Sequence, residues 1–158
     1  MILFVVLAVL LPWSLYRQMQ EHTVSRGSLI KLPLMFVGIG LLVQSGPLVP
    51  GGSGAALALT ISVAASVLFG IWRGVAIPVW TAPDGSWMSK GNRLTITLWI
   101  ALIAFKFLLG TVGSITGWFP VETMSEIFIT LGLSFAVQNY VVARRSINQP
   151  LPAHRATA

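Results

Sequence analysis

Five apolar stretches with very few charges between them constrain this chain more than any other feature of its sequence. They run over Ile2–Tyr16, Ile30–Val43, Ala55–Trp72, Leu94–Leu109 and Met124–Ala143. A helix needs about 20 apolar residues to cross the hydrocarbon core of a bilayer, so five crossings with short loops take up nearly all of the 158 residues. Only 9% of the residues are charged, against roughly 25% in a soluble domain. The sequence therefore predicts an all-α membrane protein with about five transmembrane helices.

We treat residues 1–147 as a single transmembrane domain and residues 148–158 as a disordered cytoplasmic tail, because the tail holds two prolines and small residues. The N-terminal stretch lacks the positively charged segment of a signal peptide, so we expect a retained first helix. The first two stretches are shorter than an ideal span, which snorkelling by Arg17 and Lys31 or local bilayer thinning would accommodate. A re-entrant second segment is the alternative. We expect Pro33 in the first turn of the second helix, where its missing N–H costs no hydrogen bond.

Positive charges alternate with neutral loops along the chain. The basic loops and the tail contain Arg17, Arg26 and Lys31, then Arg73, Lys90 and Arg93, then Arg144, Arg145 and Arg155. The loops over 44–54 and 110–120 contain no charge, so nine of the ten Lys and Arg residues fall on one side. The positive-inside rule then predicts an outer N-terminus and a cytoplasmic C-terminus in a bacterial inner membrane. The net charge of +6 is explained by this topology, and we expect no nucleic-acid partner.

A stripe of small residues marks the third apolar stretch. Its members recur every four residues: Gly54, Ala58, Ser62, Ser66, Gly70 and Gly74. In lipid, such a stripe lets helix backbones approach closely and gain dispersion contacts. It predicts a tightly packed helix at the centre of the bundle, with a homodimer face as the alternative.

The loop between the third and fourth stretches predicts a short β-hairpin on the cytoplasmic face. Residues 82–86 read Ala-Pro-Asp-Gly-Ser, in which proline presets φ, Asp84 bonds its own backbone and glycine accepts a positive φ. The flanks, over 75–80 and 87–88, are β-branched and aromatic, and a proline at 78 restricts its strand to an edge. Trp80 and Trp87 are expected at headgroup level. The hairpin is either an interfacial anchor or a docking element.

Lys106 is the only basic residue deep in an apolar stretch. It lies thirteen residues after Arg93, about 20 Å along a helix axis, which places it in the outer half of the membrane. A buried ionisable residue is a functional-site hypothesis by default. Its expected partners are Glu122 and Glu126, one turn apart at the start of the fifth helix. Snorkelling or a structural ion pair is the alternative to an ion or proton site.

The inner loops together form a basic collar that would attract anionic lipid headgroups. Arg73, Lys90 and Arg93 belong to it, and Asp84 and His22 are the proton-transfer groups nearest to it. The chain has no cysteine, which excludes disulfides, thiolate metal sites and Cys nucleophiles. No metal-ligand spacing, P-loop or GxSxG motif occurs. We therefore expect no cofactor and no metal, and the balance is against an enzyme.

A family resemblance rests on short motifs spread over roughly residues 16–107. They are Tyr16-Arg17, Arg26, Leu32-Pro33-Leu34, Gly70, Arg73-Gly74, Val79-Trp80, Asp84-Gly85, Ser89-Lys90-Gly91-Asn92 and Leu98-Trp99. This pattern resembles the CcdC-like small bacterial membrane proteins, which are associated with cytochrome c biogenesis by name and gene context. The resemblance implies the architecture and the hairpin rather than an activity. Since the chain lacks cysteine, any role in that process would be accessory.

Three functions remain open at this point. The first is a non-enzymatic accessory or scaffold subunit, oligomeric as a homodimer or with another membrane protein. The second is a small transporter or channel in which Lys106, Glu122 and Glu126 are the polar elements. The third is a membrane enzyme acting on an anionic lipid at the cytoplasmic collar.

Overall fold

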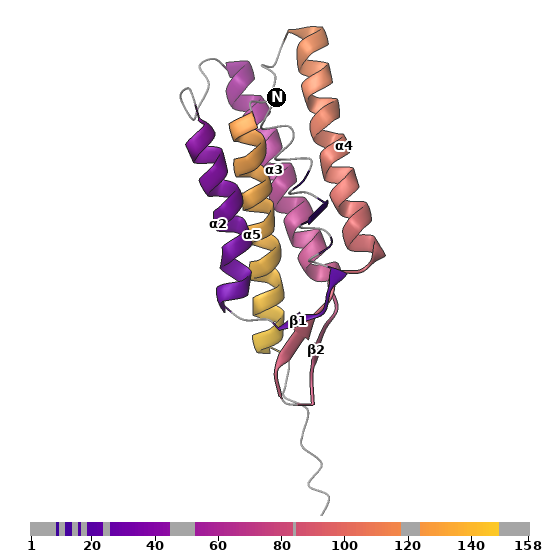
Figure 1. Cartoon of the computed structure of the whole chain (residues 1–158). Helices are drawn as coiled ribbons and strands as arrows, with labels where there is room; N and C mark the ends of the chain where they lie inside the picture. Colours follow the sequence, from indigo (N-terminus) through magenta and orange to yellow (C-terminus); the bar gives the residue numbers. More distant parts are fainter. Residues whose placement is uncertain are drawn as a thin grey trace, which may run out of the picture.

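The computed structural model describes residues 9, 12, 13, 16, 19–23, 26–44, 53–83, 85–117 and 124–148. Within them, four long helices stand side by side in one bundle, and three short strands lie together at one end of it (Figure 1). The helices are α2 (Arg26–Val43), α3 (Ser53–Ala76), α4 (Arg93–Thr116) and α5 (Met124–Asn148). The strands are β1 (His22–Thr23), β2 (Val79–Thr81) and β3 (Trp87–Ser89).

Three of these helices, α3, α4 and α5, are long and apolar enough to cross a membrane. The apolar part of α2, Leu29–Val43, is shorter, but the whole helix has 18 residues and so measures about 27 Å. That is close to the roughly 30 Å of a hydrocarbon core. Each helix extends beyond its apolar stretch, and α5 continues to Asn148. The expected first helix falls mostly outside the described residues, as does the tail after 148.

Helix α5 is the hub of the bundle, because it packs along both α2 and α3. Gly40 of α2 lies against Ser125 of α5, whereas Gly132 further along α5 lies against Pro33. These two helices are therefore antiparallel. On the other side, Gly70 and Gly74 of α3 meet α5 in the same order along both chains, so α3 and α5 are parallel. Helix α4 is antiparallel to α3, because Lys106 lies against Ser62 and Trp99 lies against Arg73. Successive helices in the described part of the chain thus alternate in direction.

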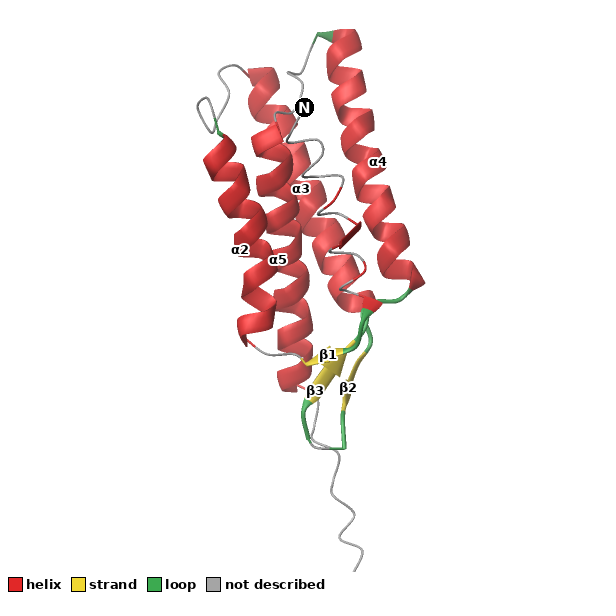
Figure 2. Ribbon diagram, in the orientation of Figure 1, coloured by secondary structure: helices red, strands yellow, loops and turns green. Residues whose placement is uncertain are grey.

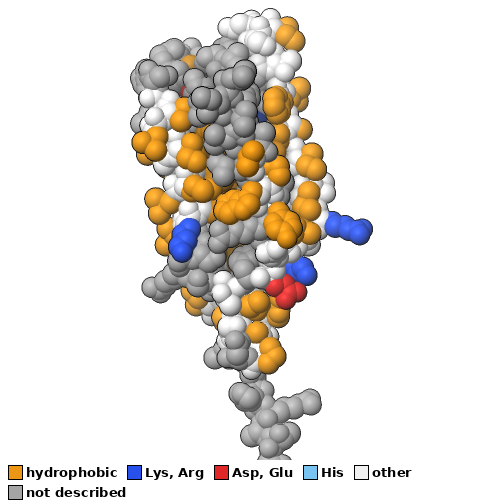
Figure 3. Space-filling model, viewed as in Figure 1, with side chains coloured by type: hydrophobic (Ala, Val, Ile, Leu, Met, Phe, Trp, Pro, Cys, Tyr) orange, Lys and Arg blue, Asp and Glu red, His pale blue; other side chains and the backbone are white. Residues whose placement is uncertain are grey.

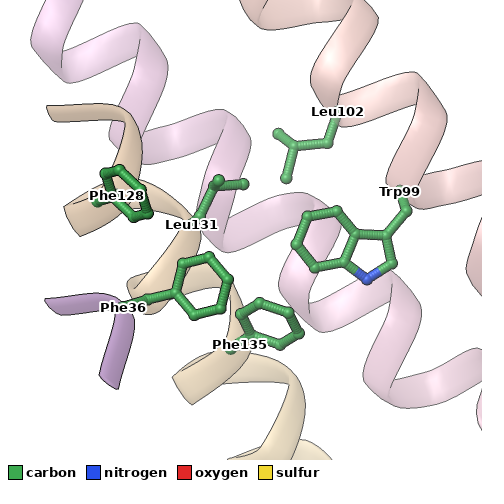
Figure 4. Packing of buried hydrophobic residues seen from close by; sticks show 6 residues of the cluster. All are labelled: Phe36, Trp99, Leu102, Phe128, Leu131 and Phe135. Atoms are coloured by element: carbon green, nitrogen blue, oxygen red, sulfur yellow. The ribbon is translucent and has the colours of Figure 1, made fainter. Parts of the chain in front are cut away.

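An aromatic cluster fills the centre of the bundle (Figure 4). Phe36 of α2 and Trp99 of α4 lie on opposite sides of Phe135 of α5, with ring centroids 5.1 Å and 4.7 Å from it. Phe128, Leu131 and Leu102 complete the cluster. Tilted ring pairs at such spacings have favourable geometry. The cluster fixes α2, α4 and α5 relative to one another.

Pro33 is not in the first turn of its helix, so that expectation is wrong. The helix begins at Arg26, and Pro33 lies inside it. A proline there cannot donate to the carbonyl four residues earlier, which belongs to Leu29. The side-chain amide of Asn139 on α5 donates to that carbonyl instead. A neighbouring helix thus satisfies the group that the proline leaves free, as is common in membrane helices.

The predicted hairpin is confirmed, with two changes. Strands β2 and β3 pair antiparallel, and Gly85 in the turn has a φ of 81°. The first strand is shorter than expected, because residues 75 and 76 continue α3. The second change is that β1 pairs with β3 and makes a three-stranded sheet in the order β1-β3-β2 (Figure 2). Strand β2, which Pro78 precedes, is indeed an edge strand.

The sheet joins two loops that are far apart in sequence. His22 lies opposite Ser89 in the register, and the Lys90 ammonium lies 3.2 Å from a Glu21 carboxylate oxygen. The loop before α2 and the loop between α3 and α4 are therefore at the same end of the bundle. In Figure 3 most of the visible Lys and Arg side chains lie in the lower part of the molecule, spread across its width.

Candidate functional site inside the helix bundle

Lys106 is buried in the bundle against α3. Its side chain is 7% exposed, and its ammonium donates a 2.6 Å hydrogen bond to the Ser62 hydroxyl. Ser62 belongs to the small-residue stripe of α3, and it is itself 1% exposed. A charged ammonium in an apolar interior needs such polar partners, since desolvation penalises it strongly. The α3–α4 interface therefore holds a cation deep in the bundle.

Of the two acidic residues predicted as partners of Lys106, only Glu126 is among the described residues. Glu122 lies outside the described residues. Glu126 is half-buried in the first turn of α5. The parallel register that sets Gly70 against Ser134 and Gly74 against Gln138 also places Ser62 level with Glu126, two turns earlier on each helix. Lys106, Ser62 and Glu126 thus come from three helices at one level of the bundle.

Arg73 is a second buried cation, and the sequence placed it wrongly at the surface of the basic collar. Its side chain is 0% exposed. The guanidinium donates through Nη2 to the Ser134 hydroxyl and through Nε to the Phe69 carbonyl at 3.3 Å. Helical side chains lean toward the N-terminus of their helix, so the charge lies near Phe69. That is about 10 Å inside the end of α3 at Ala76.

The Arg73 guanidinium lies against two aromatic rings. Its Cζ lies 4.2 Å from the ring centroid of Trp99 and 5.6 Å from that of Phe135. A cation over an aromatic face is attracted by the ring quadrupole, by about 2 kcal/mol or more when water is excluded. The packing of Trp99 from α4 onto α5, visible in Figure 4, therefore also holds the arginine.

Four buried side-chain polar atoms have no hydrogen-bond partner within the described part of the chain. They are Nη1 of Arg73, Nε1 of Trp99, Oγ of Ser66 and Oε1 of Gln138. Most buried polar groups in proteins are hydrogen-bonded, so each such atom needs an explanation, for which an unseen water or ion is one candidate. Two of these atoms belong to the Arg73–Trp99 pair, and the other two lie on α3 and α5.

The small-residue stripe of α3 faces partners within the same chain. A Cβ on Gly70 would lie 2.7 Å from the Ser134 carbonyl oxygen, and one on Gly74 would lie 2.7 Å from Val141. The stripe therefore lets α3 and α5 approach closely, while Ser62 turns to α4. The remaining members are Ala58 and Ser66, both buried, and Gly54, which is half-buried. This geometry favours the central-helix reading over the homodimer face.

The predicted residues of the hairpin are spread over the sheet rather than gathered into a site. Trp80 and Trp87 are half-buried on adjacent strands. Lys90 pairs with Glu21 on the surface, a contact worth at most about 1 kcal/mol. Arg93 is exposed at the start of α4, and Asp84 lies outside the described residues. With Arg73 inside the bundle, the collar proposed for a lipid-modifying enzyme loses its innermost arginine.

Arg145 is an unpredicted structural cation. Its Nη1 donates to the carbonyls of Gly74, Val75 and Ile77 at 2.9, 2.9 and 2.8 Å. These groups end α3, where carbonyls lack intrahelical partners and the helix dipole attracts positive charge. Arg145 therefore ties the C-terminal turn of α5 to that of α3.

Helix α5 also has a buried polar side that was not expected from the sequence. Thr130, Ser134 and Gln138 recur every four residues and are all buried. That spacing places them on one helical face. It is the sequence pattern from which a buried polar face of α5 could have been predicted. Trp99 and Asn139 carried no such local signal.

Comparisons with protein-family models, with curated proteins and with solved structures found no match for this chain.

Proposed function

We propose that the chain crosses a bacterial inner membrane five times, with its N-terminus outside and its C-terminus in the cytoplasm. Successive described helices alternate in direction, which supports one crossing for each. The basic loops meet in the sheet at one end of the bundle, and the positive-inside rule assigns that end to the cytoplasm.

We further propose that the protein is a small transporter or channel for an ion or a proton. The burial of Lys106 on Ser62, in a helix apolar enough to span the membrane, carries this proposal. Intramembrane ionisable groups are costly and usually mark ion or proton pathways. Glu126 at the same level supplies a carboxylate that could exchange a proton or share a cation with Ser62. Glu122 is the second acidic group of this pathway.

The test is a flux measurement in proteoliposomes under an imposed membrane potential, with dyes that report H⁺, Na⁺, K⁺ and Cl⁻. Wild-type protein is expected to carry flux above empty vesicles, and Lys106→Met to lower it at least tenfold. Lys31→Met is the matched control, because Lys31 is exposed on α2. Circular dichroism of each reconstituted variant verifies folding. Equal flux in both variants, or no wild-type flux of any of the four ions, would remove the basis of the proposal.

A non-enzymatic accessory or scaffold subunit is the second candidate, and the three-stranded sheet favours it. Its edge strands β1 and β2 carry backbone groups that a partner strand could pair with. The CcdC-like resemblance is densest over residues 70–99, which include the hairpin. We propose that a membrane-protein partner or a second copy docks there, with anionic lipid around the collar.

Two glycines allow a matched test of this second candidate. Gly85 in the hairpin turn and Gly117 after α4 both have positive φ and open space around them. Valine strains either position equally, but only Gly85→Val disturbs the sheet. Loss of a co-purifying protein, or of the dimer mass in mild detergent, in Gly85→Val alone supports docking. A wild-type protein that is monomeric and purifies alone would contradict it.

A further inference from the structure

We propose that Arg73 and Trp99 form a buried binding site for one small inorganic anion of the halide class. The site lies between α3, α4 and α5, in the half of the bundle nearer the sheet. It involves neither Lys106 nor Ser62, so it stands independently of the transport proposal.

The charge of Arg73 is the first argument. An arginine stays protonated in proteins, and a buried charge needs an opposite charge or a full set of hydrogen bonds. The described acidic residues do not supply that charge. Glu21 is paired with Lys90 at the surface, and Glu126 lies two turns from Ser134, about 12 Å along α5. The hydroxyl, the carbonyl and the aromatic rings around Arg73 are neutral, so the site keeps a net positive charge.

The unpartnered atoms are the second argument. Nη1 of Arg73 and Nε1 of Trp99 find no acceptor among the described residues, and the Cζ of this guanidinium lies 4.2 Å from the centroid of the indole ring. Both atoms can donate but not accept, so they select an electron-rich ligand. Ser66 Oγ is also unpartnered, and its hydroxyl can turn to donate. Gln138 can present its amide NH₂ by rotation. The two donor-only atoms of Arg73 and Trp99, beside a positive charge, favour an anion over water.

The burial of these groups limits the size of the ligand. Arg73, Trp99, Ser66 and Ser134 are all 0% exposed, so a ligand bound among them has to be small. A single-atom anion needs the least room. It is also less costly to transfer from water than a multiply charged oxyanion, because the cost of burying charge rises with charge. Chloride is therefore the probe of choice, and phosphate is the contrasting one.

Unfolding in detergent tests the site without any flux measurement. Chloride is exchanged for gluconate at constant ionic strength, and the unfolding equilibrium is followed by circular dichroism. For one site on the folded state, each tenfold rise in the chloride concentration above the dissociation constant raises the ratio of folded to unfolded protein tenfold. Trp99→Phe keeps an aromatic ring under the arginine but removes the donor, and it is expected to shift the response to at least tenfold higher chloride. Arg73→Gln is expected to abolish the response.

Lys90→Gln is the control for surface charge, because Lys90 is exposed beside Glu21, and it is expected to respond like wild type. Phosphate in place of chloride is expected to give no site-specific response. If Arg73→Gln does not fold, Trp99→Phe decides. A wild-type protein indifferent to chloride, or a Trp99→Phe variant with an unchanged response, would overturn the proposal in favour of a buried water. A response to phosphate as strong as that to chloride would overturn the assignment to halides.

Discussion

Asn139 offers the sharpest test of the helix packing, because it repairs a specific defect in α2. Its side-chain amide donates to the Leu29 carbonyl, which cannot receive an N–H from Pro33. Replacement by leucine leaves that carbonyl without its donor at a partly buried position between α2 and α5. A lost hydrogen bond with an unsatisfied partner costs about 1–3 kcal/mol, although hydrogen bonds between membrane helices average only about 0.6 kcal/mol. We expect Asn139→Leu to lower the free energy of unfolding by about 1–2 kcal/mol.

The mechanism predicts that this cost depends on Pro33. In a Pro33→Ala background, residue 33 gains an N–H that can reach the Leu29 carbonyl within α2. Asn139→Leu should then cost less, and a double-mutant cycle should give a coupling free energy of about 1 kcal/mol. Equilibrium unfolding in mixed micelles, followed by circular dichroism, measures all four proteins. A coupling within about 0.3 kcal/mol of zero, the usual error for independent sites, would refute the repair.

Two further substitutions test the contacts of α3. Gly70→Ala should destabilise the protein by about 1–3 kcal/mol, because its Cβ would lie 2.7 Å from the Ser134 carbonyl oxygen. A Cβ added at Gly38 would have no neighbouring atom within 4 Å, so Gly38→Ala should be neutral or stabilise the protein by up to about 1 kcal/mol. Thermal unfolding in detergent distinguishes the two variants. Arg145→Met should lower the free energy of unfolding by about 1.5–3 kcal/mol, because three carbonyls at the end of α3 lose their donor. Arg144→Met, at an exposed neighbouring position, should stay within about 0.5 kcal/mol of wild type, and equal effects in the two arginine variants would contradict the capping role.

The hairpin and the stripe could be predicted from sequence because local chemistry determines them. A Pro-Asp-Gly turn between aromatic and β-branched residues specifies its own backbone, and Gly85 adopts the positive φ expected of it. The four-residue spacing of the stripe predicts a line of small residues that winds slowly around α3, so that Gly70 and Gly74 meet α5 and Ser62 meets α4. Three apolar helices of membrane-spanning length likewise follow from composition and length alone.

Contacts between distant segments could not be predicted in the same way. Strand β1 has two residues, too few for a periodic signal, and it forms because β3 is available to pair with it. Pro33 is tolerated inside α2 through Asn139, which is 110 residues away in sequence. Within the candidate site, the sequence left open whether Lys106 is buried or snorkels, since its neighbours Phe107 and Leu108 in the same apolar stretch are exposed. Its bond to Ser62 depends on how α4 packs on α3.

Arg73 shows that a count of charges near helix ends does not tell where each charge lies. The positive-inside rule counts a cation near the end of a helix without regard to the direction of its side chain. In α3 the helix geometry directs Arg73 back along the bundle, and Trp99 offers its ring there. Arg145 turns inward as well, to the end of α3, while Arg93 and Arg144 remain exposed. The cations that could meet lipid headgroups are therefore fewer than the sequence suggests, and the inward-turned arginines instead connect α3 to α4 and α5.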